Sequence, residues 1–385
     1  MTRELLSLDF YGSELVAARA AFDEEKATIT INRLLRQPCG GFSGARVLDK
    51  TKAQEELAAL IENLTQEATT PVSVVVGVRG GMLSFRRSSG FSSVSSRNYL
   101  IGTREIESAL HNAVPSSVKD TLEVVDIFPQ SYTIDGNEGI INPKGRPGCT
   151  LEAITFLSLA KPEYLQDLRD VFKACGCPEF HVLPSGIAQA DRLLRSNEKE
   201  AGALFVDIGT LSTSAVIYFQ NTLVCAWEIP LGKNSVLKAV AEVLQNDLET
   251  AADVLKNYKP GTDEIIDDVL KEAQENLLAA VKKELQQSLL YVQHPCTHLV
   301  LSGLGADKHS LAECKKAFSA RKARLAEVDL LARSSYPKEP LVCTGAISLI
   351  THALVREISE LSTLQEKPSG LIDSLLDKIG LGELF

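Results

Sequence analysis

The sequence lacks an excess of positive charge, a long apolar run and closely spaced metal-ligand pairs. Its formal net charge is −10, which gives a nucleic-acid partner little electrostatic support. No run approaches the ~18 apolar residues that cross a membrane, and the opening stretch MTRELLSLDF has no apolar segment of the kind found in a signal peptide. These absences predict a cytoplasmic protein without a nucleic-acid partner.

The cysteines and histidines do not predict a metal site. The eight cysteines are scattered, and Cys175 and Cys177, the one close pair, have a single spacer residue, which is poor metal-ligand spacing. His294 and His298 have the spacing of a helical metal pair, but Pro295 between them argues against a shared helix face. Buried cytoplasmic thiols are the expected state of the cysteines.

The sequence has an ordinary globular composition and enough length for more than one domain. Of its 385 residues, 44% are hydrophobic and 23% are charged. The stretch Ala203–Phe219, ALFVDIGTLSTSAVIYF, predicts two apolar β-strands joined by a tight turn. Asp207 ends the first strand and Gly209 opens the turn. Such a turn is either an ordinary hairpin or a cradle for phosphate and Mg²⁺.

A second stretch repeats this plan near the start of the chain. Leu6–Ala20 places an apolar strand, Asp9 and a Gly12-Ser13 turn before a second apolar strand, and Leu299–Ala306 supplies a late Ser-Gly turn. Two Asp-Gly hairpins about 200 residues apart, followed by a late glycine turn, form a layout that resembles the actin-like superfamily. In that superfamily two similar α/β halves hold a nucleotide between their hairpins.

Between these landmarks the hydrophobic pattern predicts further elements. We expect strands at Ala27–Arg33 and Val72–Val78 and a helix at Thr51–Ala68. The serine- and arginine-rich stretch Arg86–Ser96 predicts a loop. A helix is expected at Lys271–Tyr291, whose apolar face serves either the core or an interface, with the core favoured.

The segment Phe128–Leu151 carries the most specific signature. It contains Pro129-Gln130-Ser131-Tyr132, then Ile134-Asp135, then Gly139-Ile140-Ile141-Asn142-Pro143-Lys144-Gly145, and then Gly148. This order of motifs resembles the bacterial cell-division protein family FtsA, whose members are membrane-tethered actin homologues. The resemblance continues through Cys175-Gly176, Ile229-Pro230-Leu231-Gly232 and Ala252-Asp253-Val254-Leu255-Lys256, and so covers essentially the whole chain in order.

The resemblance implies an α/β fold of the actin-like class, in which duplicated ribonuclease-H-like halves surround a nucleotide cleft. Residues 1–84 and 166–200 would form the large subdomain of the first half, and residues 201–228 and 296–361 that of the second. Residues 85–165 would form the extra FtsA subdomain and residues 229–295 the small subdomain of the second half. A linker at 362–370 and an amphipathic helix at 371–385 would follow.

The resemblance also implies a site for ATP and Mg²⁺. An actin-like site needs glycines, because backbone N–H groups must approach phosphate oxygens with no side chain between them. It needs an aspartate from each half, Asp9 and Asp207 here, to hold Mg²⁺ largely through water. The residues assigned to the nucleotide are Asp9, Gly12, Ser13, Asp207, Gly209, Ser212, Thr213, Asp253, Lys256, Gly303 and Gly305.

Several positions depart from the family pattern of this site. Either Tyr11 replaces a glycine in the first hairpin or one residue is inserted there, Thr210 and Leu211 stand for two glycines in the second, and Leu304 interrupts a glycine pair. A β-carbon at Leu211 crowds a phosphate oxygen. We therefore expect ATP to bind weakly or not at all, and no efficient hydrolysis and no catalytic residue. A purely structural cleft is the alternative.

The C-terminal tail predicts an amphipathic helix. Leu371, Ile372, Leu375, Leu376 and Ile379 share one helical face, and Leu384 and Phe385 close the chain. These seven apolar residues are the predicted membrane-binding set, and FtsA proteins end in such a membrane-targeting helix. The tail is nonetheless acidic and lacks the basic face that attracts anionic lipid. The alternative is a helix that packs on protein.

The sequence thus predicts an FtsA-like scaffold on the cytoplasmic face of the inner membrane at the division septum. By the resemblance, its partners would be the C-terminal tail of FtsZ, other division proteins and further copies of itself in an oligomer or polymer. Two alternatives remain, a pilus-assembly scaffold of the same fold and a small-molecule kinase of the actin superfamily. The kinase would need an acceptor pocket and a general base, and we find no candidate base beyond the two hairpin aspartates.

Overall fold

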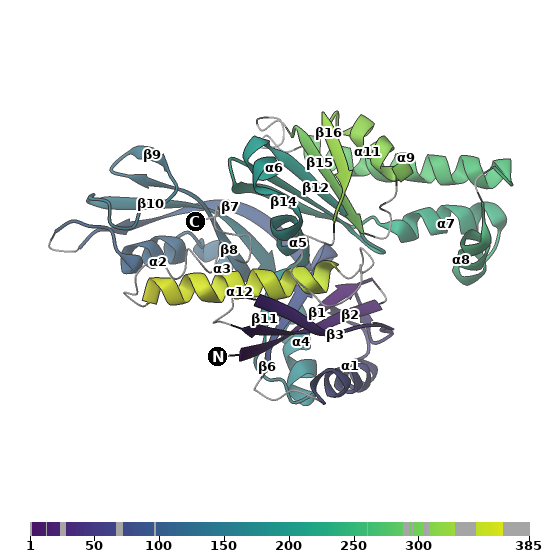
Figure 1. Cartoon of the computed structure of the whole chain (residues 1–385), viewed down its shortest axis with the longest axis horizontal. Coiled ribbons are helices and arrows are strands. Elements are labelled where there is room, and N and C mark those ends of the chain that lie inside the picture. Colours follow the sequence, from purple (N-terminus) through teal and green to yellow (C-terminus); the bar gives the residue numbers. More distant parts are fainter. Residues whose placement is uncertain are drawn as a thin grey trace.

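The computed structural model describes most of the chain up to residue 364. The described residues are 2–12, 14–23, 28–66, 72–95, 98–259, 261–287, 293, 296–303, 306, 308–327 and 344–364. Two five-stranded sheets form the centres of two halves, and a four-stranded sheet with two helices projects from the first half (Figure 1).

The two five-stranded sheets have the same plan. The first has the order β11-β6-β1-β2-β3 and the second the order β14-β13-β12-β15-β16, so each has a central strand between an antiparallel and a parallel neighbour. The first comprises β1 (Thr2–Tyr11), β2 (Glu14–Asp23), β3 (Thr28–Pro38), β6 (Val72–Val78) and β11 (His181–Pro184). The second comprises β12 (Ala203–Ile208), β13 (Thr213–Phe219), β14 (Thr222–Ile229), β15 (His298–Gly303) and β16 (Lys322–Leu325).

The predicted hairpins are present, and the first contains no bulge near its turn. Asp9 pairs with Val16 and Tyr11 with Glu14 in unbroken register, so β1 runs through Tyr11 to the turn. Both central strands are buried because helices cover both faces of a sheet built on a parallel pair. On one side of the first sheet lie α1 (Lys50–Thr65) and α4 (Pro162–Ala174), whose leucines share a core with β1 and β6.

Helices α5 (Ser185–Leu193) and α12 (Thr344–Leu364) lie between the two halves (Figure 1). One continuous core joins Leu5 of β1 and Phe205 of β12 to Ile187 of α5 and Ile347 of α12. The two halves therefore share one apolar core. Helix α12 reaches Leu364, so residues 362–364, which were expected to begin a linker, are helical. The rest of that linker and the predicted C-terminal helix lie outside the described residues.

The four-stranded sheet has the order β7-β10-β8-β9. Its strands are β7 (Leu83–Ser93), β8 (Glu123–Ile134), β9 (Asn137–Ile140) and β10 (Thr150–Ala160), with α2 (Thr103–Asn112) and α3 (Ser116–Lys119) beside them. The loop expected at Arg86–Ser96 was wrong, because β7 pairs with β10 along its whole length. An edge strand with one solvated face tolerates serine and arginine, and only Leu83 and Gly90 of β7 are buried.

The second half carries a helical subdomain. It contains α7 (Lys233–Leu244), α8 (Leu248–Asn257) and α9 (Glu264–Gln286). On α9, Leu277, Leu278 and Leu285 are buried, so this part of the helix serves the core. The remaining short elements are β4 (Phe42–Ser43), β5 (Arg46–Val47), η1 (Gly80–Met82), α6 (Ser196–Ala201) and α11 (Lys308–Ala317).

Candidate functional site

The two predicted aspartates meet at the junction of the halves. Asp9 lies near the end of β1 and Asp207 near the end of β12, which are the central strands of the two sheets. Both residues are fully buried. Because parallel strands end at the same edge of a sheet, β6 delivers its following residue, Arg79, to the same place as Asp9.

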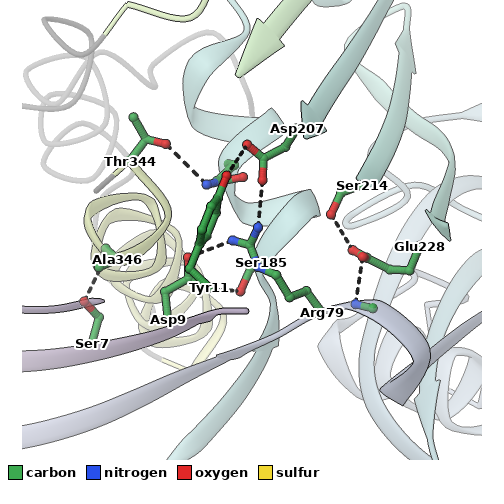
Figure 2. A network of polar contacts seen from close by, with 12 residues as sticks. Ser7, Asp9, Tyr11, Arg79, Ser185, Asp207, Ser214, Glu228, Thr344 and Ala346 are labelled. Carbon is green, nitrogen blue, oxygen red and sulfur yellow. Dashed lines mark hydrogen bonds and ion pairs between the residues drawn. The ribbon is translucent and has the colours of Figure 1, made fainter. Parts of the chain in front are cut away.

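Arg79 lies between the two carboxylates (Figure 2). Its Nη2 donates to Asp9 Oδ2 and its Nη1 donates to Asp207 Oδ2, each at 2.7 Å. Only 4% of its side chain is exposed. Burial by itself would lower the pKa of Arg79, but the charges of Asp9 and Asp207 outweigh this effect and raise it, so the guanidinium stays charged.

The other oxygens of these carboxylates also have donors. Ser185 Oγ donates to Asp9 Oδ1 at 2.6 Å, and the Tyr11 hydroxyl donates to Asp207 Oδ1 at 3.4 Å. The Tyr11 ring stacks under Arg79, with the guanidinium carbon 4.5 Å from the ring centroid. With its amide oriented to satisfy its neighbours, Gln189 donates to Asp207 Oδ2 at 3.1 Å.

A third carboxylate, the half-buried Glu228, adjoins this group. Its Oε2 accepts from the backbone N–H of Gly80 at 2.8 Å, and its Oε1 accepts from Ser214 Oγ at 2.7 Å (Figure 2). Burial raises the pKa of Glu228 to about 7, and the charge of Asp207 adds to the effect. The interface therefore holds three carboxylates against one guanidinium, and Glu228 is the group whose pKa lies near neutrality.

The two hairpin turns are in direct contact. A β-carbon at Gly12, whose φ is +73°, would lie 2.5 Å from the β-carbon of Thr210. Across the cleft, a β-carbon at Gly303 would lie 2.7 Å from the Tyr11 hydroxyl. Glycine is required at both positions because the opposing hairpin or side chain approaches so closely.

The backbone groups of the second hairpin are bonded within the protein. The N–H of Gly209 donates to the carbonyl of Ser212 at 2.9 Å. At the start of α7, the N–H groups of Lys233 and Asn234 donate to the carbonyls of Gly209 and Thr210 at 2.8 and 2.9 Å. The turn is thus capped by a helix N-terminus, whose N–H groups commonly bind anions.

A pocket of about 250 Å³ remains outside the contact between the hairpins. Tyr11, Arg46, Arg79, Tyr164 and Leu211 are among its larger side chains, and Gly12 and Gly209 of the two turns also line it. Its volume is below the roughly 300–1,000 Å³ of typical small-molecule sites.

The structure brings most of the predicted nucleotide residues together and separates two of them. The group at the junction of the halves contains Asp9, Gly12, Asp207, Gly209, Ser212, Thr213 and Gly303. Asp253 and Lys256 are exposed on α8, at the outer end of the helical subdomain (Figure 1). Ser13, Gly305 and all the predicted membrane-binding residues, from Leu371 to Phe385, lie outside the described residues.

The sequence analysis missed four members of the group, the buried Arg79, Ser185 and Gln189 and the half-buried Glu228. Arg79 carried a signal, since a charged residue directly after the apolar strand Val72–Val78 points to a strand end that meets other polar groups. Among the described residues, no cluster of histidine, cysteine and acidic side chains has the arrangement of a metal site.

A family model described as the SHS2 domain inserted in FtsA matches residues 80–157. These residues cover nearly all of the four-stranded sheet. The chain carries the SHS2 domain of FtsA proteins. The sequences of known proteins agree with this assignment. FtsA of Streptococcus pneumoniae is 25% identical over 219 residues, and FtsA of Bacillus subtilis is 24% identical over 220.

The sequence matches differ in extent. The pneumococcal and Bacillus matches each cover 57% of this chain and 48% and 50% of those proteins, so the chain spans about half the length of these curated relatives. FtsA of Escherichia coli K12 is 21% identical over 340 residues, which cover 80% of each chain. Together the matches support an FtsA-type cell-division protein.

Solved structures show that the fold is actin-like. A chain of the PilM–PilN type IV pilus biogenesis complex has a TM-score of 0.66 and 17% identity, with 91% of this chain and 98% of that chain covered. MreB5 of Spiroplasma citri bound to ADP has a TM-score of 0.51 and 12% identity, with 93% and 98% covered. At these identities the likeness concerns the fold alone.

Proposed function

We propose that the chain is an FtsA-type scaffold that links the FtsZ ring to the cytoplasmic face of the inner membrane at the division septum. The observation that carries this proposal is the position of the SHS2 domain. The SHS2 sheet is inserted into the first actin-like half between η1 and α4. The family match begins at Gly80, the first residue of η1. An actin-like chain with this insertion is what the FtsA relatives lead us to expect.

The proposed partners are the C-terminal tail of FtsZ, other division proteins and further copies of the chain. The proposed membrane contact is the apolar face of residues 371–385. No helix among the described residues is long and apolar enough to span a bilayer. An amphipathic helix that lies in the membrane surface needs only one apolar face, and burying five large side chains contributes up to about 1.5–3 kcal/mol each.

We further propose that the scaffold is not an enzyme and that it binds ATP weakly or not at all. The FtsA relatives are named as cell-division proteins, and MreB5 of the same fold has been solved with ADP and with AMPPNP. In support, Arg79 of this chain bonds to both Asp9 and Asp207, and the Tyr11 ring stacks on its guanidinium. A turnover above about 1 s⁻¹ with any phosphate acceptor would instead indicate a kinase.

The decisive experiment is co-sedimentation with vesicles of phosphatidylethanolamine and phosphatidylglycerol. We expect the full chain to pellet and to carry purified FtsZ of the same organism with it. A truncation after Lys367 is expected to stay in the supernatant, and FtsZ lacking its C-terminal tail is expected not to follow the full chain. If the full chain and the truncation both stay in the supernatant, the membrane proposal is wrong, and the tail is a packing helix.

The pilus-assembly alternative has the likeness to the PilM–PilN complex in its favour, but that likeness is one of fold. A fluorescent fusion in the organism of origin separates the two scaffolds. We expect a band at midcell that disappears when FtsZ is depleted, whereas a pilus-assembly scaffold would keep its position.

A further inference from the structure

The centre of the cleft is occupied by a side-chain cation. We propose that Arg79 takes the place of a divalent cation between Asp9 and Asp207, so that the chain closes its cleft with its own side chains and needs neither Mg²⁺ nor a nucleotide to do so. This inference rests on the proposal that the chain binds ATP weakly or not at all, and it is independent of the proposed FtsZ and membrane contacts. It rests on the contacts in Figure 2.

The residues present do not fit a magnesium ion at this position. Mg²⁺ takes oxygen ligands at about 2.0–2.1 Å in a near-octahedral arrangement and usually keeps several waters, so it would need room for itself and these waters where Arg79 lies. Both Oδ2 atoms already accept from Arg79, and both Oδ1 atoms accept from Ser185 or Tyr11. A guanidinium has only donors, so it cannot serve as a ligand, and its charge repels a second cation.

Contacts of the neighbouring backbone and of Tyr11 also hold Arg79 in place. The next residue, Gly80, donates its N–H to Glu228 of β14, so the backbone at this point is fastened to the second half. The Tyr11 ring covers the guanidinium at 4.5 Å. Moving the side chain out would leave Asp9 and Asp207 facing each other without a counter-charge in a buried site, which is strongly unfavourable.

The two hairpin turns are also in direct contact, with no ligand between them. Gly12 and Thr210 are in contact, so the two turns pack directly on each other, and the pocket of about 250 Å³ lies outside this contact. The carbonyls of Gly209 and Thr210 bind the first N–H groups of α7, which a phosphate would otherwise use. The Tyr11 hydroxyl, which comes from the first hairpin, lies close to Gly303 at the end of β15. These contacts join β1, β12, β15 and α7 without any ligand.

The experiment is thermal unfolding of the full chain in EDTA, in about 5 mM MgCl₂ and in about 5 mM Mg-ATP. A ligand that binds the folded state raises Tm by mass action. We expect the wild type to show the same Tm within about 2 °C in all three conditions. A rise of more than about 2 °C with MgCl₂ or Mg-ATP would overturn the proposal.

Variants test whether Arg79 is the substitute for the cation. Arg79→Ala leaves two buried carboxylates without a cation, and we expect its Tm to rise by more than about 2 °C with MgCl₂. Arg79→Lys keeps the positive charge and is expected to stay indifferent to MgCl₂. Arg46→Ala is the matched control, because Arg46 lines the same pocket and its guanidinium stacks on Tyr164 at 5.4 Å.

The responses of the variants to MgCl₂ decide whether Arg79 substitutes for the cation. A folded Arg79→Ala protein that ignores MgCl₂, or an Arg79→Lys protein that requires it, would contradict the assignment of Arg79. If Arg79→Ala does not fold, the wild type and Arg79→Lys still decide the question.

Discussion

Replacing Arg79 by methionine tests how much the two halves depend on this residue. Methionine keeps much of the side-chain length and removes the charge, so Asp9 and Asp207, both fully buried, lose their ion pairs at 2.7 Å. Breaking a buried pair by removing one partner costs about 3–5 kcal/mol, because an uncompensated charge is left behind. For halves of this size, that corresponds to a fall in Tm of about 6–20 °C.

The assay is thermal unfolding at a fixed scan rate, followed by circular dichroism. Arg36→Met is the matched control, since Arg36 pairs with Glu14 at the surface with 40% of its side chain exposed. Exposed pairs contribute about 0–1 kcal/mol, so we expect a Tm shift below about 4 °C for this control. The free energy lost by Arg79→Met should also shrink at low pH, where the unpaired carboxylates take up protons.

A triple variant completes the test. Combining Arg79→Met with Asp9→Asn and Asp207→Asn removes every charge of the two pairs, and replacing a whole buried ion pair with neutral groups is often neutral in stability. We therefore expect the triple variant to regain most of the lost Tm. If Arg79→Met unfolds within about 2 °C of the wild type, the ion pairs do not hold the halves together, and the reasoning fails.

Three further perturbations follow from other contacts. Burial raises the pKa of Glu228 from 4.5 to about 7, so between these pH values the folded state holds a proton that the unfolded state releases. The free energy of unfolding should therefore fall by up to about 3 kcal/mol as the pH rises from 4.5 to 7. Denaturant titrations of Glu228→Gln should show a smaller dependence on pH. Gly90→Ala places a methyl group against the backbone of Ala109 in α2 and should destabilise the four-stranded sheet by about 1–3 kcal/mol. Gly81→Ala has open space around the new methyl group and should change stability by less than about 0.5 kcal/mol. Equal effects of the two variants would refute the packing argument. The Asp135 carboxylate accepts hydrogen bonds from the N–H groups of Cys149 and Thr150. Asp135→Ala should therefore speed hydrogen exchange at those two amides. Unchanged exchange there would show that Asp135 does not protect them.

The hairpins could be predicted because their signal is local. Leu6–Ala20 and Ala203–Phe219 combine buried β-strand patterns with turn residues, and the structure has β1, β2, β12 and β13 there. The strand Val72–Val78 was predicted with the bounds it has, because an apolar run between Pro71 and Gly80 leaves little choice.

The contents of the cleft could not be predicted because they depend on distant parts of the chain. Arg79 and Asp207 are 128 residues apart, and only the parallel pairing of β1 with β6 brings Arg79 beside Asp9. Tyr11 was noticed as a departure from a glycine pattern, but the contact of its ring with Arg79 required the fold. Similarly, the serines of β7 predicted a loop, because its pairing with β10 is non-local.

A crystal structure of the full chain grown with Mg-AMPPNP tests the central claim most directly. The account predicts an actin-like fold in which Arg79 bridges Asp9 and Asp207, the turns at Gly12 and Thr210 touch, and no nucleotide lies between them. A nucleotide between the two turns, with Mg²⁺ beside Asp9 and Asp207 and Arg79 displaced, would contradict it.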